Sequence, residues 1–195
     1  MAEDLTDRVR IRDEHVLSHK RYKLSEYEFD YLRNDGTWQG QNREVFDRKH
    51  AAAVLPIDPA RGTVILVSQF RLPAFLTGHK KPLIEVIAGA LDGDAPDACV
   101  RREAMEEAGV GVFDLKEIFH CFMSPGAVTE RMHLFVGTYS QKSRASEGGG
   151  LVDEGEDIEV LELHFAEALD MVASGDIVDA KTIMLLQYAK LAGLA

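Results

Sequence analysis

The sequence has few cysteines and no long apolar run. Only Cys99 and Cys121 are present among 195 residues, too few for a disulfide framework, and they lack metal-site spacing. We interpret them as small core residues in a reducing compartment. No stretch approaches the roughly 18 apolar residues of a membrane span, and the charged N-terminus lacks the apolar core of a signal peptide. These absences predict a cytoplasmic protein with no membrane partner.

The chain also lacks a basic excess. It has 33 acidic residues against 22 basic ones, and its net charge is -11. The phosphates of nucleic acids and anionic membranes would repel such a chain, so neither is expected as a partner. A small anionic substrate is compatible with this charge if metal ions and local cationic side chains offset the field.

The first 50 residues have the pattern of a separate β unit. Residues 15–34 alternate loosely, Asp35-Gly36 is a hairpin signal, and residues 37–49 form the expected returning strand. Such a unit is too small to be stable alone, so it must pack on the rest of the chain or on a second subunit. We expect an N-terminal antiparallel unit over residues 1–50 and a main domain over residues 51–195.

The main domain mixes strands and helices without regular βαβ repetition, which predicts an α+β fold with a sheet between helices. One helix is expected after Asp94 as N-cap, ending at Gly109; a second ends at Gly175, and a third is capped by Asp179. Residues 140–150 are polar and glycine-rich, which predicts a mobile loop. The expected strands are residues 51–57, 63–70, 82–89, 117–123, 131–139 and 157–165.

The first of these helices carries three glutamates on one face. At about 100° per residue, Glu103, Glu106 and Glu107 fall within an arc of about 100°. Like charges on one face destabilise an isolated helix. Such a face is either a solvated surface or a site for a hard cation, because carboxylate oxygens are what Mg²⁺ binds. For an arbitrary helix the solvated surface is the better interpretation.

The residues around these glutamates favour the interpretation as a cation site. Residues 102–110, REAMEEAGV, match the pattern R-E-U-x-E-E-x-G-U (U apolar), and the chain on this basis resembles Nudix hydrolases. The family's preceding pattern, G-x5-E-x7-R, is altered here. Gly89 stands one residue too close to the acidic position, which is Asp94 instead of Glu, while the spacing from Asp94 to Arg102 is kept.

The resemblance extends over roughly residues 15–190 and is strongest to the GDP-mannose hydrolase and ADP-ribose pyrophosphatase branch. The short loop and the run SPG-x-x-T-E look most like the GDP-mannose hydrolases. This resemblance implies an α/β/α sandwich and an N-terminal antiparallel sheet that forms a homodimer and completes the substrate pocket. The stretches that carry it are residues 43–48, 69–71, 88–92, 123–130, 148–162 and 179–188.

The resemblance also implies roles for particular residues. Mg²⁺, with Mn²⁺ as a possible substitute, would be bound by Glu103, Glu106, Glu107, Glu156 and the carbonyl of Ala88. Arg102 would orient the glutamates, and the role of general base is shared between Glu154 and Glu156. For each the alternative is an ordinary surface residue. Residues expected to contact the substrate are Arg43, Glu44, Arg71, Glu130 and Lys181.

Three functional hypotheses follow. The first is Mg²⁺-dependent hydrolysis of a nucleoside diphosphate sugar, GDP-mannose giving GMP and mannose 1-phosphate. The second is the same reaction on ADP-ribose; Arg21 and Asn42 depart from the GDP-mannose hydrolase pattern, which leaves the nucleotide preference open. The third is a Nudix-fold binding module without turnover, which the intact glutamates disfavour.

His15 and His19 have H-x3-H spacing, but no third ligand is evident.

Overall fold

The structure is a computed structural model that describes residues 4–194 except the side chain of Glu154. The chain divides into two compact units. Unit 1 comprises Met1–Lys49 and Phe122–Glu130, and unit 2 comprises His50–Cys121 and Arg131–Ala195. None of the helices in the described part of the chain is long and apolar enough to cross a membrane.

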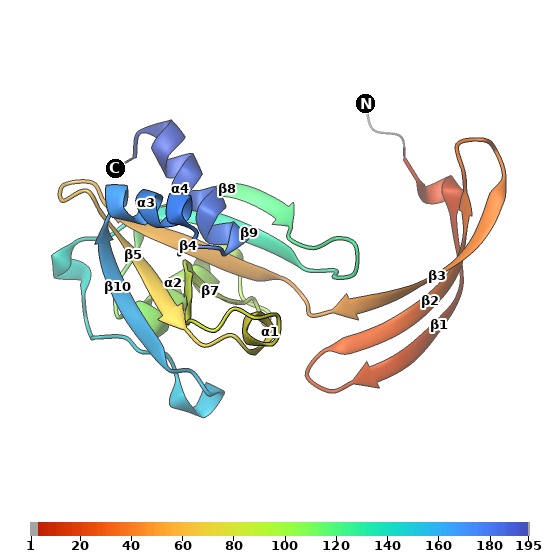
Figure 1. Ribbon diagram of the computed structural model, residues 1–195, viewed down its shortest axis with the longest axis horizontal. Coiled ribbons are helices and arrows are strands. Elements are labelled where there is room, and N and C mark those ends of the chain that lie inside the picture. Colours follow the sequence, from red (N-terminus) through yellow and green to blue (C-terminus); the bar gives the residue numbers. More distant parts are fainter. Residues whose placement is uncertain (1–3, 195) are drawn as a thin grey trace. The chain divides into compact units, whose positions relative to one another are not determined.

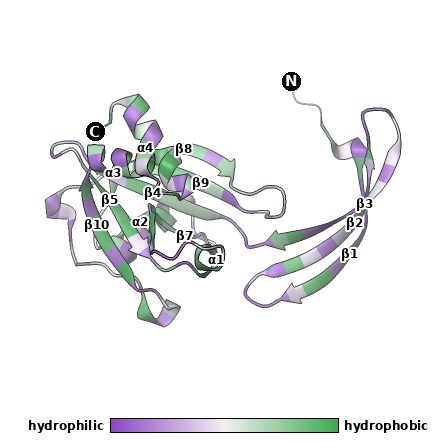
Figure 2. Cartoon of the chain, in the orientation of Figure 1, coloured by the Kyte–Doolittle hydropathy of each residue, from purple (hydrophilic) through white to green (hydrophobic). Residues whose placement is uncertain are grey.

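Unit 1 is a three-stranded antiparallel sheet in the order β1-β2-β3 (Figure 1). The pattern of residues 15–34 predicted one segment, but the structure has two strands there, because β1 begins earlier and a turn at residues 20–22 separates it from β2. Hydrophilic and hydrophobic residues alternate along these strands (Figure 2). The elements are a 3₁₀ turn η1 (Thr6–Arg8), β1 (Val9–His19), β2 (Lys23–Leu32) and β3 (Trp38–Asp47).

The Asp35-Gly36 hairpin is confirmed. Gly36 has a φ of 81° and donates its N–H to the carbonyl of Arg33 at 3.0 Å, a left-handed conformation that glycine adopts without strain. The later segment of unit 1 joins the sheet through β3. Phe46 donates its N–H to Ala127 at 2.7 Å and accepts one from Thr129 at 3.1 Å.

Unit 2 contains the remaining strands and helices. The strands are β4 (Ala51–Asp58), β5 (Thr63–Gln69), β6 (Leu83–Glu85), β7 (Ile87–Ala90), β8 (Phe113–Phe122), β9 (Arg131–Thr138) and β10 (Ile158–His164). The helices are α1 (Leu72–Leu76), α2 (Pro96–Ala108), α3 (Phe165–Ser174) and α4 (Ala180–Ala192), with 3₁₀ turns η2 (Gln141–Ser143) and η3 (Val152–Glu154).

The sheet of unit 2 is mixed and opens in its middle. Its order is β10-β5-β4-β9-β8, and β4 runs parallel to β9. β4 and β5 pair only where Ile57 faces Val64 and Asp58 faces Thr63. Beyond that point β7 pairs with β4 and β6 pairs with β5. The single strand expected over residues 82–89 is therefore two short strands with different partners.

Two helical layers cover this sheet, as expected for an α/β/α sandwich (Figure 1). Because successive strand residues point to opposite faces, Ala52 and Val54 of β4 pack in the core beneath Ala104 and Ala108 of α2. α3 and α4 pack together and contact other strand residues, and Leu185 of α4 is fully buried. The central strands β4 and β5 are thus shielded from water on both faces, since all of their residues are buried.

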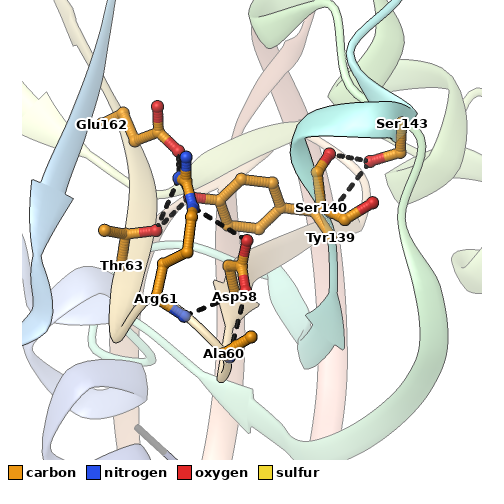
Figure 3. Close-up of polar contacts among 8 residues, drawn as sticks. All are labelled: Asp58, Ala60, Arg61, Thr63, Tyr139, Ser140, Ser143 and Glu162. Atoms are coloured by element: carbon orange, nitrogen blue, oxygen red, sulfur yellow. Dashed lines mark hydrogen bonds and ion pairs between the residues drawn. The ribbon is translucent and has the colours of Figure 1, made fainter.

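The turn between β4 and β5 is held by one arginine (Figure 3). The Arg61 Nε atom lies 3.0 Å from Asp58, and its guanidinium also donates to Thr63 and forms an ion pair with Glu162 of β10. Tyr139 joins this group by hydrogen bonds to Thr63 and Glu162, both at 2.7 Å. These contacts fix three strands at the end of the sheet.

The observed ends of the helices can be compared with the caps predicted from the sequence. Gly109 and Gly175 end α2 and α3 in the left-handed conformation, and Asp179 caps α4 by accepting the N–H of Thr182 at 3.0 Å, so all three predictions are confirmed. The N-cap predicted at Asp94 is wrong. The N-cap of α2 is Ala95, because the Asp94 carboxylate accepts from Arg102 instead.

Candidate active site

Two glutamates of α2 are buried. The exposed fraction is 9% for Glu103 and 1% for Glu107, whereas Glu106 is only partly buried. Residues four apart on a helix lie on one face, and this face is turned toward β7. Two of the three carboxylates therefore point into the protein, which does not fit the alternative of a solvated acidic face.

Glu107 has little to offset its charge. Among the described residues its hydrogen-bond donor is the N–H of Ala88 on β7, at 3.3 Å, and it forms no ion pair. Burial, reinforced by the like charge of Glu103, raises the pKa of Glu107 from 4.5 to about 8. A buried carboxylate of this kind is costly unless a cation compensates it.

Glu103 lies against the backbone of β7. A Cβ atom added to Gly89 would stand 1.7 Å from Oε1 of Glu103, so only glycine leaves room for this carboxylate. Burial raises the pKa of Glu103, and the nearby charge of Arg102 opposes that rise. Gly89 therefore has a clear role in the structure, although its spacing departs from the family pattern.

Arg102 connects the carboxylates. Its Nη1 atom lies 2.9 Å from both Glu103 and Glu106, and its Nε lies 3.3 Å from Asp94. A planar guanidinium has a fixed fork of donors, so these contacts orient Glu103 and Glu106 together.

The loop before β10 is attached to α2. Gly149 and Gly150 donate their N–H groups to the carbonyls of Glu107 and Glu106, at 2.9 and 3.1 Å. The expected mobile loop at residues 140–150 is thus hydrogen-bonded to the helix. Within the same loop Glu156 accepts the N–H of Leu151 at 2.9 Å, and its charge raises the pKa of both Glu103 and Glu107. The side chain of Glu154 lies outside the described residues.

Another buried carboxylate, that of Glu85 on β6, is surrounded by cations. Its oxygens lie 2.7 Å from Nε of Arg71 and 2.5 Å from Nζ of Lys181. Lys181 also pairs with Asp179 at 2.9 Å. Burial alone would favour the neutral amine, but the two carboxylates outweigh it and raise the pKa of Lys181. The side chain of Arg71 is 41% exposed, whereas that of Lys181 is only 12% exposed and its ammonium is paired with carboxylates.

The other sequence candidates lie in unit 1. Arg43 on β3 is exposed and donates to the Asn42 carbonyl at 2.7 Å and to Gln41 at 2.9 Å. Its neighbour Glu44 is exposed as well. Glu130 is buried and pairs with Arg48 at 3.2 Å.

Two features of the site were not predicted from the sequence. Glu85 sits in an otherwise apolar strand, PLIEVIAG, and a lone acid in a buried strand was a signal that a cation must lie nearby. The contact of Gly89 with Glu103 joins two elements and had no local signal.

The arrangement suits a divalent cation. Two buried carboxylates, a third beside them and Glu156 from the docked loop lie near enough for their charges to interact, so this face of α2 has several oxygen donors and an excess of negative charge. Oxygen donors of this kind bind Mg²⁺ or a similar hard ion. A cation here would supply the positive charge that neutralises the Glu107 carboxylate.

Comparison with known proteins agrees with this chemistry. Residues 47–184 match the NUDIX domain, and residues 8–46 match the N-terminal domain of the GDP-mannose pyrophosphatase NudK. The chain therefore belongs to the Nudix family and is a pyrophosphatase of the Nudix hydrolase type. Nudix hydrolases generally use a divalent metal.

Individual relatives match over nearly the full length. The chain is 46% identical to a GDP-mannose pyrophosphatase of Yersinia enterocolitica, over 94% of this chain and 95% of that protein. It is 41% identical to a GDP-mannose pyrophosphatase of Escherichia coli O1:K1, over 97% and 99% of the two chains. A crystal structure of an ADP compounds hydrolase has the same fold, with a TM-score of 0.73 at 19% identity and full coverage of both chains.

Proposed function

We propose that the protein hydrolyses the pyrophosphate bond of GDP-mannose, giving GMP and mannose 1-phosphate. The observation that carries this proposal is that one chain contains both the buried carboxylates of α2 and an N-terminal unit that matches a GDP-mannose pyrophosphatase domain. The full-length similarity to two GDP-mannose pyrophosphatases supports the substrate. ADP-ribose is the second candidate, because the chain's fold is shared with an ADP compounds hydrolase.

We propose Mg²⁺ as the cofactor, with Mn²⁺ as a substitute. Glu103, Glu107 and Glu156 would hold it, with Glu106 and the carbonyl of Ala88 as further ligands. When bound, the ion neutralises the pyrophosphate and lowers the pKa of water. The buried carboxylates support this assignment, since without a cation they cost free energy in the fold.

The residues of the chain would then orient the reactants and move a proton. Water attacks phosphorus as the bridging P–O bond breaks, and the leaving group departs as a phosphate monoester. Glu156 and Glu154 share the role of accepting the water's proton. Arg102 acts as a positioning residue, since its guanidinium holds Glu103 and Glu106 in one orientation.

Direct substrate contacts are proposed for four of the five residues that the sequence suggested. Arg71 has an exposed part of its guanidinium available for a phosphate while its Nε is held by Glu85. Lys181 acts through Glu85, which it holds in place. Arg43, Glu44 and Glu130 are proposed to contact the nucleotide or sugar, as the resemblance implies.

We also propose a homodimer formed through the N-terminal sheet. β1 is an edge strand whose Ile11 side chain is 60% exposed. Unit 1 has a groove of about 720 Å³ lined by Arg43 and apolar residues of its three strands and by residues of the segment 122–129. Exposed apolar patches of this kind are typical of interfaces.

Light scattering after size-exclusion chromatography should show a dimer. The Ile11→Asp variant should be a monomer, whereas the control Leu191→Asp, at an exposed position of α4, should remain a dimer. A wild-type monomer would contradict the proposal.

The reaction is tested by incubating the purified protein with MgCl₂ and GDP-mannose, ADP-ribose, ADP-glucose or diadenosine tetraphosphate in separate reactions. Products are separated by chromatography, and parallel reactions contain EDTA. EDTA-sensitive release of GMP that is fastest from GDP-mannose is the expected result. A preference for ADP-ribose would keep the mechanism and change the substrate. No turnover by the folded protein would favour a binding module instead.

A further inference from the structure

A second group of potential metal-binding residues lies on strands β8 and β9, at one edge of the sheet of unit 2. These strands carry none of the proposed catalytic residues. Glu117 and His120 belong to β8, and His133 belongs to β9. Each offers one ligand atom, and these atoms all lie within 4.8 Å of one another. Sequence spacing did not reveal this group because its third member comes from the neighbouring strand.

The three side chains are already in contact. The rings of His120 and His133 stack with centroids 3.9 Å apart and planes inclined by 14°. Nδ1 of His133 lies 2.8 Å from Oε1 of Glu117. His133 is partly buried, whereas Glu117 and His120 are exposed, so an ion can reach the group from solvent.

The donor set differs in kind from that on α2. Two imidazole nitrogens and one carboxylate oxygen are ligands that Zn²⁺ and similar transition ions prefer, and open His₂Glu sites are a known zinc arrangement. Mg²⁺ instead prefers oxygen ligands alone. The two groups should therefore bind different ions from the same solution.

Coordination needs one adjustment. The lone pairs of an imidazole lie in the plane of its ring, so two stacked rings direct them side by side. The exposed ring of His120 can turn until its nitrogen converges with that of His133. The positive charge of Arg131 near His120 acts against a cation, and the carboxylate of Glu117 offsets it.

We propose that Glu117, His120 and His133 form a site for one Zn²⁺ ion, or a transition ion of similar preference, that links β8 to β9. The remaining coordination positions would be filled by water. Because an ion that binds only the folded state stabilises it, Zn²⁺ at this site should raise the thermal stability of the protein.

The test separates this site from the others by using excess Mg²⁺. Protein stripped with EDTA and dialysed into millimolar MgCl₂ is titrated with ZnCl₂ by calorimetry, and its melting temperature is followed. Mg²⁺ occupies oxygen-only sites but does not compete for imidazole. The expected result is one Zn²⁺ per chain and a higher melting temperature. X-ray absorption of the bound zinc should show nitrogen ligands at about 2.0 Å.

Three variants make the assignment specific. His120→Ala and Glu117→Gln should each weaken Zn²⁺ binding by at least about tenfold, since even outer-shell changes weaken metal sites by 10–100-fold. The double variant His15→Ala/His19→Ala is the matched control and should bind like the wild type. Absence of Zn²⁺ binding, binding unaffected by His120→Ala, or binding lost in the control variant would each overturn the proposal. Circular dichroism checks that every variant is folded.

Discussion

Two buried glutamates of unit 2, Glu85 and Glu107, have opposite surroundings. Their exposed fractions are 3% and 1%. Glu85 contacts Arg71 and Lys181, whereas Glu107 has one backbone N–H and two other carboxylates near it. The first carboxylate is neutralised by the chain's own cations. The charged form of the second, which metal binding requires, has no ion pair among the described residues to compensate it, and this is the property expected of a metal ligand.

The largest expected effect comes from removing that uncompensated charge. Glu107→Gln should lower kcat/KM by about 10³-fold, since metal-ion catalysis contributes several kcal/mol and each ~1.4 kcal/mol is a factor of ten. The metal-free variant should nevertheless be at least as stable as the wild type. Steady-state assays with GDP-mannose and urea denaturation in EDTA measure the two quantities. Glu167→Gln, at an exposed position of α3, is the control. Full activity of Glu107→Gln would remove Glu107 from the metal site.

The opposite result is expected at the compensated carboxylate. Glu85→Gln should destabilise the protein by about 3 kcal/mol, because it leaves the buried ammonium of Lys181 with Asp179 alone. Urea denaturation measures the change, and Glu159→Gln on the exposed side of β10 is the control. A loss of activity without a loss of stability would instead give Glu85 a direct role in catalysis.

The contrast between these glutamates shows what sequence reasoning could reach. The α2 motif and the glycines that end helices are local signals, so α2 and the helix ends at Gly109 and Gly175 were predicted correctly. The orientation of Glu103 and Glu107 into the protein was not, because it depends on β7 pairing with β4 and approaching the helix.

The features that were not predicted depend on contacts between residues far apart in the sequence. Glu85 and Lys181 are 96 residues apart, and no local pattern links an acid in a strand to a lysine in a helix. Asp94 was a reasonable N-cap by composition, but Arg102 competes for its carboxylate. The third strand of unit 1 was missed because charged residues in β1 hide its alternation.

The pH dependence of the metal-free protein should reveal the cost of Glu107. Its pKa in the folded state, about 8, is above the ordinary value of 4.5, so the folded protein holds a proton that the unfolded chain releases. The resulting stability is present below pH 4.5 and is lost as the pH rises through 8, a change on the order of a few kcal/mol. Urea denaturation in EDTA from pH 5 to 9 measures it. Glu107→Gln should flatten this fall, and an unchanged slope in the variant would mean that another group causes it.

The smallest effect is expected from moving a ligand without removing it. Gly89→Ala places a methyl group where the Glu103 carboxylate lies, so the carboxylate must shift while its charge and its contact with Arg102 can be kept. A displacement of about 1 Å in a catalytic group costs up to about 10²-fold in rate, which is less than the loss expected for Glu107→Gln. Gly111→Ala is the matched control, because its added Cβ would make only ordinary contacts, the nearest at 3.5 Å. If Gly89→Ala keeps wild-type kcat/KM while Glu107→Gln does not, then the metal site does not depend on the position of Glu103, and the close approach of Glu103 to β7 serves only packing.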